Sequence, residues 1–136
     1  MTNTNLSPEL FRVIDANLNR LKEGIRVIED IMRYRDNNQE LSKKLKSLRH
    51  LAHLEQYQEL LLHRDSINDV LRPTSSSELQ RNNIVSIIAA NFKRAQESSR
   101  VLEEMLKLSN AKKSETFKHI RYELYDLEKQ IVLNEN

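Results

Sequence analysis

ANLNRLKEGIRVIEDIM at residues 16–32 and ANFKRAQESSRVLEEML at residues 90–106 align without gaps, at an offset of 74 residues. In both stretches the apolar residues follow the spacing of about 3.6 residues that is typical of an amphipathic helix. The same polar residues recur too, in the pairs Asn17 and Asn91, Arg20 and Arg94, Glu23 and Glu97, Arg26 and Arg100, and Glu29 and Glu103. This repeat predicts two related helical units in one chain.

The helix that carries the first copy is expected over about residues 8–35. Ser7 and Pro8 suit a helix cap and a first helical position. After it, the polar run 36–38 competes with helix and can cap a second one, expected over about residues 39–63. The connection is short, which favours an antiparallel neighbour.

The helix that carries the second copy is expected over about residues 78–108. The run 77–80, Ser-Glu-Leu-Gln, matches a capping box, in which a serine and a glutamine satisfy exposed amide groups at a helix start. Ser99 falls at a position of its apolar stripe where an apolar residue is expected. A fourth helix is expected to be nucleated near Ser114, because an apolar stripe follows it.

The second and fourth helices echo the repeat more weakly, since Arg49 and Arg121 stand in similar surroundings at an offset of 72 residues. We therefore predict an all-α fold, an antiparallel four-helix bundle built from two repeated αα-hairpins. Residues 1–136 are expected to form a single helical domain. Its predicted parts are repeat 1 over about 8–63, a loop over 64–77 and repeat 2 over about 78–133.

Composition narrows the function classes. The 22 basic and 20 acidic residues nearly balance, which argues against a general nucleic-acid groove. The chain has no cysteine, so thiolate metal sites are excluded, and its single glycine excludes Gly-rich phosphate loops. Residues 1–5 show no signal-peptide pattern, and no apolar run is long enough to span a membrane. We expect a cytoplasmic protein.

The recurring polar residues have two interpretations. They can be ion pairs at the boundary of the core, retained from a duplication, since Arg26 and Glu29 can pair with each other or across helices. They can also line a polar cleft shared by both hairpins, because packing alone does not demand that the same polar residues recur.

Several basic residues could bind phosphate, since guanidinium groups match phosphate oxygens; the candidates are Arg49, Arg121, Lys93, Arg94 and Arg64. With so many basic residues in the chain, a solvated surface is the competing interpretation for each. The run 43–46 beside Arg49 is better explained as a wet helix face than as a binding strip.

Asp65 and Asp69 lie where the second helix gives way to the loop. Two carboxylates there could hold Mg²⁺, which takes one or two protein oxygens together with phosphates. Alternatively, Asp65 caps a turn and Asp69 faces water. The histidines lack the Glu-x-x-His spacing of di-metal helical bundles, and His50 and His53 have no third ligand in view.

Five ordered motifs resemble those of one known family. They are ANLNRLKEGIRVIED at 16–30, LKSLRHL at 45–51, LLHRDSINDV at 61–70, ANFKRAQESSRVLEEMLKL at 90–108 and IRYELYDLE at 120–128. The resemblance is to the all-helical domain found fused ahead of thiamine-phosphate synthase, described as a monofunctional hydroxymethylpyrimidine-phosphate kinase. It covers about residues 11–128.

The resemblance implies a function in thiamine biosynthesis, the transfer of the γ-phosphoryl group of ATP to hydroxymethylpyrimidine phosphate. The acceptor is already an anion, so positioning and charge neutralisation should dominate. On this basis we expect Arg49, Arg121 and Lys93 or Arg94 at the phosphates, with Asp65 and Asp69 at Mg²⁺. Binding and orientation of the pyrimidine phosphate are assigned to four residues: Asn17, Arg20, Asn91 and Arg64.

Two alternatives remain. The chain can be a non-catalytic helical partner of thiamine-phosphate synthase, which the absence of every familiar ATP motif favours. It can also be a nucleic-acid-binding helical module that uses the basic face 43–49, whose marker would be binding that depends strongly on salt. This last interpretation is the least favoured, because few aromatic residues are available to stack on bases.

Overall fold

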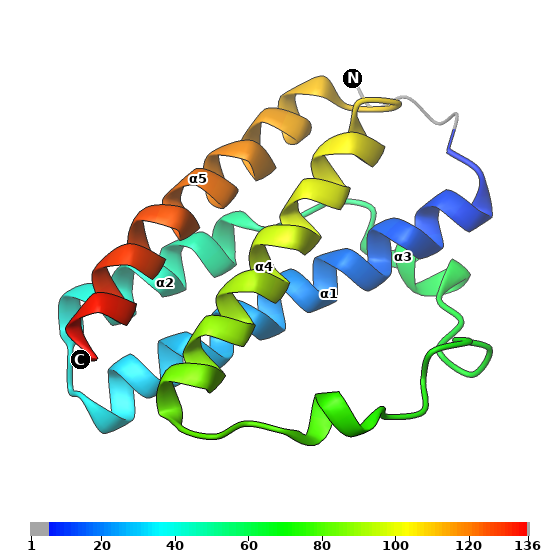
Figure 1. The fold of residues 1–136 in the computed structure, drawn as a ribbon. Coiled ribbons are helices and arrows are strands. Elements are labelled where there is room, and N and C mark those ends of the chain that lie inside the picture. Colours follow the sequence, from blue (N-terminus) through cyan, green and yellow to red (C-terminus); the bar gives the residue numbers. More distant parts are fainter. Residues whose placement is uncertain (1–5, 136) are drawn as a thin grey trace.

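A computed structural model describes residues 6–135 of the chain (Figure 1). The run 1–5, on which the signal-peptide expectation rests, lies outside that range. The described residues contain no strand, and the predicted all-α class is confirmed. The helices are α1 Pro8–Asp30, α2 Gln39–Leu51, α3 Tyr57–His63, α4 Ile84–Leu106 and α5 Ala111–Asn134. A π-helical turn, Ile31–Arg35, extends α1, and a 3-10 turn, Ser76–Leu79, precedes α4.

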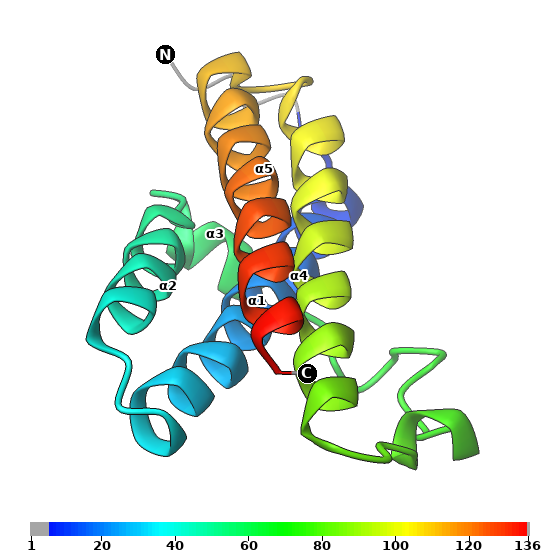
Figure 2. The same cartoon turned by 60° about the vertical axis from the view of Figure 1, so that its left-hand side comes forward.

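The two helices that carry the repeat pack against each other. α4 crosses α1, α5 runs beside α4, and α2 and α3 pack on α1 (Figures 1 and 2). α1 and α4 approach each other closely at Gly24, because a Cβ atom there would stand 3.1 Å from the main-chain oxygen of Asn91 and 3.4 Å from the Cβ of Ala95. The only glycine of the chain thus serves the central helix crossing.

One hydrophobic core draws buried residues from all five helices. The predicted stripes of α1, α4 and α5 are buried almost throughout, and Phe92 and Phe117 are fully enclosed. The helix starts at residues 8 and 39 are confirmed as well: the Ser7 side chain accepts from the amide of Leu10, and the Asn38 side chain accepts from the amide of Leu41. Local patterns were sufficient here, because caps and apolar faces agree.

The prediction of one continuous helix over about residues 39–63 is wrong. The helix breaks after Leu51, and α3 begins only at Tyr57. Ala52 and Leu54 are both buried, although on an unbroken helix they would point about 200° apart. A non-helical link over residues 52–56 lets both face the core. In α3, which follows, Leu60 is buried and Leu62 is 76% exposed.

The predicted start of the third helix is also wrong. α4 begins at Ile84, where the Asn83 side chain accepts a hydrogen bond of 2.9 Å from the amide of Ser86. Before that point Leu79 is exposed, so a helix there would have no apolar face to bury. The fourth helix begins earlier than Ser114, at Ala111, and Ser114 instead donates to the main-chain oxygen of Glu103.

Candidate functional site

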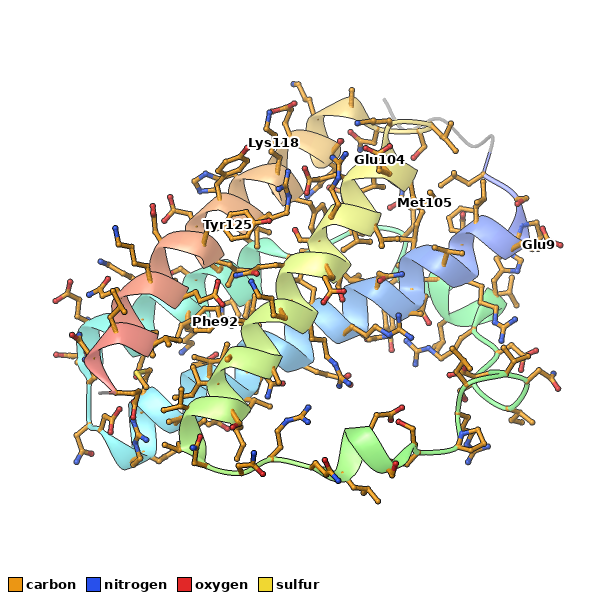
Figure 3. All side chains as sticks on the ribbon, in the orientation of Figure 1. Glu9, Phe92, Glu104, Met105, Lys118 and Tyr125 are labelled. Atoms are coloured by element: carbon orange, nitrogen blue, oxygen red, sulfur yellow. The ribbon has the colours of Figure 1, made fainter. Side chains whose placement is uncertain are left out.

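A hollow of about 690 Å³ lies between the first half of α1 and the segment that follows α3. We call it the α1 hollow. Glu9, in the first turn of α1, is one of its lining residues and lies on the right-hand side of Figure 3. The hollow brings together half of the predicted site residues: Asn17, Arg20, Arg64, Asp65 and Asp69. Its other lining residues are Glu9, Arg12, Val13, Asp15, Ala16, Asn19, Glu23 and Ser66.

Arg64 is held in the α1 hollow by Asp15. Its Nε and Nη2 donate to the two carboxylate oxygens of Asp15, at 2.7 and 2.8 Å. The Asp15 side chain is 7% exposed and that of Arg64 is 38% exposed. Hydrogen bonding to the carboxylate raises the pKa of Arg64. The pair therefore holds the guanidinium of Arg64 at the wall of the hollow. Among the described residues, no group accepts a hydrogen bond from the Nη1 of Arg64.

Asp15 is not among the site residues predicted from the sequence. A signal for it existed, because Asp15 follows Ile14 on the side of α1 that faces the core, and a buried carboxylate requires a partner. The identity of that partner could not be read from the pattern, since Arg64 lies 49 residues further along the chain.

Asp65 and Asp69 order the segment after α3. The carboxylate of Asp65 accepts from the backbone amide of Asn68 at 3.1 Å and from its side-chain amide at 2.7 Å. Both hydrogen bonds lower the pKa of Asp65, and the bond from the Asn68 side chain has the larger effect. Asp69 accepts from the amide of Leu71 at 3.0 Å. Asp65 thus has the turn-capping role that was the alternative to magnesium binding, whereas Asp69, which that alternative expects only to face water, also accepts a hydrogen bond within the turn.

The same two carboxylates remain chemically suitable for Mg²⁺. Carboxylate oxygens can accept more than one interaction, and hydrated Mg²⁺ needs only one or two protein ligands beside phosphate. Across the described residues, no group of three His, Asp or Glu side chains forms a ready metal cage. A cation here would therefore arrive with its phosphate ligand.

The predicted asparagines are positioned alike in the two halves. Asn17 donates to the main-chain oxygen of Val13 at 2.9 Å, and Asn91 donates to that of Ile87 at 2.8 Å. Only Asn17 lines the α1 hollow. Because its amide nitrogen is engaged, its carbonyl oxygen remains to accept a hydrogen bond from a ligand.

The side chains of Arg49 and Arg121 are 16% and 15% exposed, so the competing interpretation of a solvated surface does not describe them. Arg49 pairs with Glu29 through its Nε at 2.7 Å and Nη2 at 3.2 Å. Arg121 pairs with Glu103 through the same two atoms, at 2.5 and 2.9 Å. The glutamate side chains are only 2% and 3% exposed. Hydrogen bonding to these carboxylates raises the pKa of both arginines.

The remaining predicted cations lie apart from the α1 hollow. Lys93 is 3.6 Å from the carboxylate of Glu128. Arg94 is exposed, and its main-chain oxygen accepts from Ser98. Lys93 lines a separate hollow of about 380 Å³ formed only by residues of α4 and α5. These two hollows therefore do not form a single cleft that is shared by both copies of the repeat.

The charge of the α1 hollow is mixed. Arg64 and Asp15 neutralise each other, which leaves Arg12 and Arg20 beside four carboxylates, those of Glu9, Glu23, Asp65 and Asp69. A bare phosphate would meet more negative than positive charge. A phosphate accompanied by a divalent cation would match both signs.

Over residues 6–135, no helix is long and apolar enough to cross a bilayer.

Comparisons with known proteins agree on one family. A family model described as the ThiD2 family matches residues 12–130. Proteins named thiamine-phosphate synthase are 39% identical over 140 residues in Prochlorococcus marinus subsp. pastoris, 38% over 136 in Thermosynechococcus vestitus and 37% over 124 in Nostoc punctiforme. These matches cover 97%, 96% and 90% of the chain, but only 39%, 39% and 35% of those proteins. No solved structure gives a significant match.

Proposed function

Because the chain belongs to the ThiD2 family, we propose that it acts in thiamine biosynthesis and that the α1 hollow binds a phosphorylated pyrimidine. The observation that supports this proposal best is the pair Asp15–Arg64, which holds a guanidinium beside Asp65 and Asp69 in one hollow. Arginine fixed in this way is suited to a phosphate group, and the neighbouring carboxylates are suited to Mg²⁺.

The reaction we propose is the phosphorylation of hydroxymethylpyrimidine phosphate by ATP. An oxygen of the acceptor phosphate attacks the γ-phosphorus, and the bond from that phosphorus to the β,γ-bridging oxygen breaks, which gives the diphosphate and ADP. The negative acceptor needs no strong base, so the residues chiefly position the reactants and neutralise charge. Mg²⁺ would lower the repulsion between the phosphates.

Individual roles follow from the arrangement of the α1 hollow. Arg64 and Arg20 would hold phosphate oxygens, and Asp65 and Asp69 would bind the hydrated Mg²⁺. The carbonyl oxygen of Asn17 would accept a hydrogen bond from the amino group of the pyrimidine. Asp15 acts through Arg64 and is a positioning residue.

A second candidate is a non-catalytic helical partner of thiamine-phosphate synthase. The chain spans about two fifths of the length of the curated relatives that it matches, and those relatives carry the name of the synthase. This observation supports the partner function at least as directly as the kinase function. The burial of Arg49 and Arg121 in ion pairs also favours it, since two of the predicted catalytic cations are already engaged.

The test is an assay of the purified chain with ATP, Mg²⁺ and hydroxymethylpyrimidine phosphate, read by phosphorus NMR for the diphosphate. Arg64→Gln should lower turnover about a hundredfold or more, as loss of a charge-stabilising donor does in other enzymes. Arg72→Gln is the matched control, because Arg72 is exposed on the same segment but does not line the hollow.

Turnover that survives in Arg64→Gln would contradict the assigned site. Absence of turnover in the unaltered chain, combined with saturable calorimetric binding to thiamine-phosphate synthase, would instead establish the partner function.

A further inference from the structure

A second hollow, of about 460 Å³, lies between the end of α1 and the start of α2. We call it the α2 hollow. Its lining includes Arg33 from the π-helical turn, Ser42, Lys43 and Lys46 from α2, and the buried Glu29. Glu29 and Asn17 are separated by 12 residues of α1, or about 18 Å of helix. The α2 hollow is therefore distinct from the α1 hollow.

The α2 hollow carries cations without acidic partners. Within the part of the chain that the structure describes, no acidic side chain forms a salt bridge with Arg33, Lys43 or Lys46. Glu29 does not compensate them, because Arg49 already neutralises it. Three positive charges therefore face the same hollow.

Carboxylates near the α2 hollow are engaged by other cations. Asp30 pairs with Arg26 at 3.2 Å and Glu40 with Lys44 at 3.3 Å. Asp36 receives two hydrogen bonds from Arg35, at 2.6 and 2.7 Å. The charge of the hollow thus has no local source of neutralisation.

The corresponding place in the second half of the chain differs. A hollow of about 410 Å³ surrounds Glu103 and is lined by Lys107, Glu115 and Lys118 at the positions equivalent to Arg33, Lys43 and Lys46. There Glu115 replaces a lysine, and Lys107 is bound to Glu104 at 2.7 Å. The accumulation of unpaired cations is therefore not a by-product of the repeated scaffold.

We propose that the α2 hollow binds a compact oligophosphate anion. Lys43 and Lys46 lie three residues apart on one helix face and repel each other, and Arg33 adds a third like charge. An anion with several charged oxygens in a small volume would relieve this repulsion and accept hydrogen bonds from all three side chains. The site is separate from the proposed substrate site and does not require phosphoryl transfer.

The test is isothermal titration calorimetry of the full chain with sodium pyrophosphate, at low salt and without Mg²⁺. The double variant Lys43→Gln/Lys46→Gln should weaken binding about tenfold or more, because two of the three facing charges are removed. Lys44→Gln is the matched control: Lys44 lies between the two, pairs with Glu40 and does not line the hollow. It should bind pyrophosphate as the unaltered chain does.

A second arm separates this site from the α1 hollow. Arg64→Gln should leave pyrophosphate binding unchanged, whether or not the chain has kinase activity. In a third arm, ATP should compete with pyrophosphate, because the phosphate groups alone are recognised.

Three results would overturn the proposal. They are equal weakening by Lys44→Gln, unchanged binding by the double variant, and preferential binding of a duplex oligonucleotide with a steep dependence on salt, which would assign the basic face to nucleic acid. The replaced side chains are exposed, and coincident thermal unfolding curves would show that the variants are folded.

Discussion

The two halves of the chain contain the same buried ion pair in different surroundings. Glu29–Arg49 joins α1 to α2, and Glu103–Arg121 joins α4 to α5. Outside these pairs the halves diverge. The guanidinium of Arg121 also lies 5.0 Å from the ring of Tyr122, whereas His50 occupies the equivalent position beside Arg49.

This arrangement bears on the two interpretations of the repeat. Glu29 and Glu103 form buried ion pairs between helices, as the first interpretation expects, and the hollows are not a cleft common to both copies. The α1 hollow depends instead on residues that the second half lacks. Asp15 corresponds to Ala89, and the segment 64–69 occurs once. The two halves share the buried ion pairs, and the candidate site lies where their sequences differ.

The largest expected effect is on the buried pairs themselves. Arg49→Met should lower the free energy of unfolding by about 3–5 kcal/mol, because it leaves the buried Glu29 without its partner. Arg121→Met should lower it less, because Arg100 still lies 3.8 Å from the carboxylate of Glu103. Urea unfolding measures both. Lys44→Met is the control, since its pair with Glu40 is exposed and should contribute below about 1 kcal/mol. Unchanged stability with lost turnover would mean that these arginines act on the ligand.

Replacing both partners sharpens the same comparison. Glu29→Met/Arg49→Met should recover much of the loss, since a buried pair exchanged for apolar groups of similar size is often neutral. The same result for Glu103→Leu/Arg121→Met would show that the two halves are equivalent in this respect.

The second prediction concerns a pair that only the first half contains. Asp15→Asn should lower the free energy of unfolding by about 1–2 kcal/mol, because two charge-assisted hydrogen bonds to a partly exposed arginine are weakened. It should also weaken substrate binding through the misplacement of Arg64. Asp126→Asn on α5 is the control, because Asp126 is exposed. A stability loss as large as that of Arg49→Met would mean that Asp15 is chiefly structural.

Capping residues and apolar stripes predicted the helices correctly wherever packing against distant parts of the chain did not act against them. Ser7 was correct as a cap, and the run 36–38 supplied one through Asn38, because the apolar stripes that follow them are buried. The break at residues 52–56 could not be predicted in this way, since it depends on Leu54 and Leu60 reaching a core that α1 helps to form. The capping-box pattern at residues 77–80 failed because the residues after it have no surface to pack against.

The candidate site was also predictable only where its residues lie close together in the sequence. Arg64, Asp65 and Asp69 were selected from one short motif, and the structure keeps them together in the α1 hollow. The partners Asp15 for Arg64 and Glu29 for Arg49 are 49 and 20 residues away. Pairings at such distances follow from how α1 packs against α2 and α3, which a single sequence pattern does not contain.

A third prediction tests a core position at which the halves differ. Ser99 replaces Ile25 of the first copy, and its hydroxyl donates to the main-chain oxygen of Phe117 at 2.7 Å. Ser99→Ala should lower the free energy of unfolding by about 1 kcal/mol, because a buried hydrogen bond between α4 and α5 is lost. Ser98→Ala is the control, since Ser98 bonds only within α4, to Arg94. Equal effects would mean that the bond between the helices adds nothing.

The smallest effect belongs to Asp65, in the segment that the second half does not repeat. Its pKa is held below the ordinary value of 3.8, first by the Asn68 side chain. A lowered pKa in the folded chain stabilises the fold at pH values above about 4, and this contribution is lost as the pH falls through the folded pKa. Asn68→Ala should therefore raise the pKa of Asp65 toward its ordinary value, as read from the carboxyl carbon shift in NMR.

Asp36 provides the internal reference for that titration. Its pKa is also lowered, but by the side chain of Arg35 at the far end of α1, and it should not respond to Asn68→Ala. If the two aspartates shifted together, the change would reflect general loosening of the chain. If neither shifted, Asn68 would not order this segment, and the shape of the α1 hollow would have to rest on Arg12, which donates to the main-chain oxygen of Asp65 at 2.8 Å.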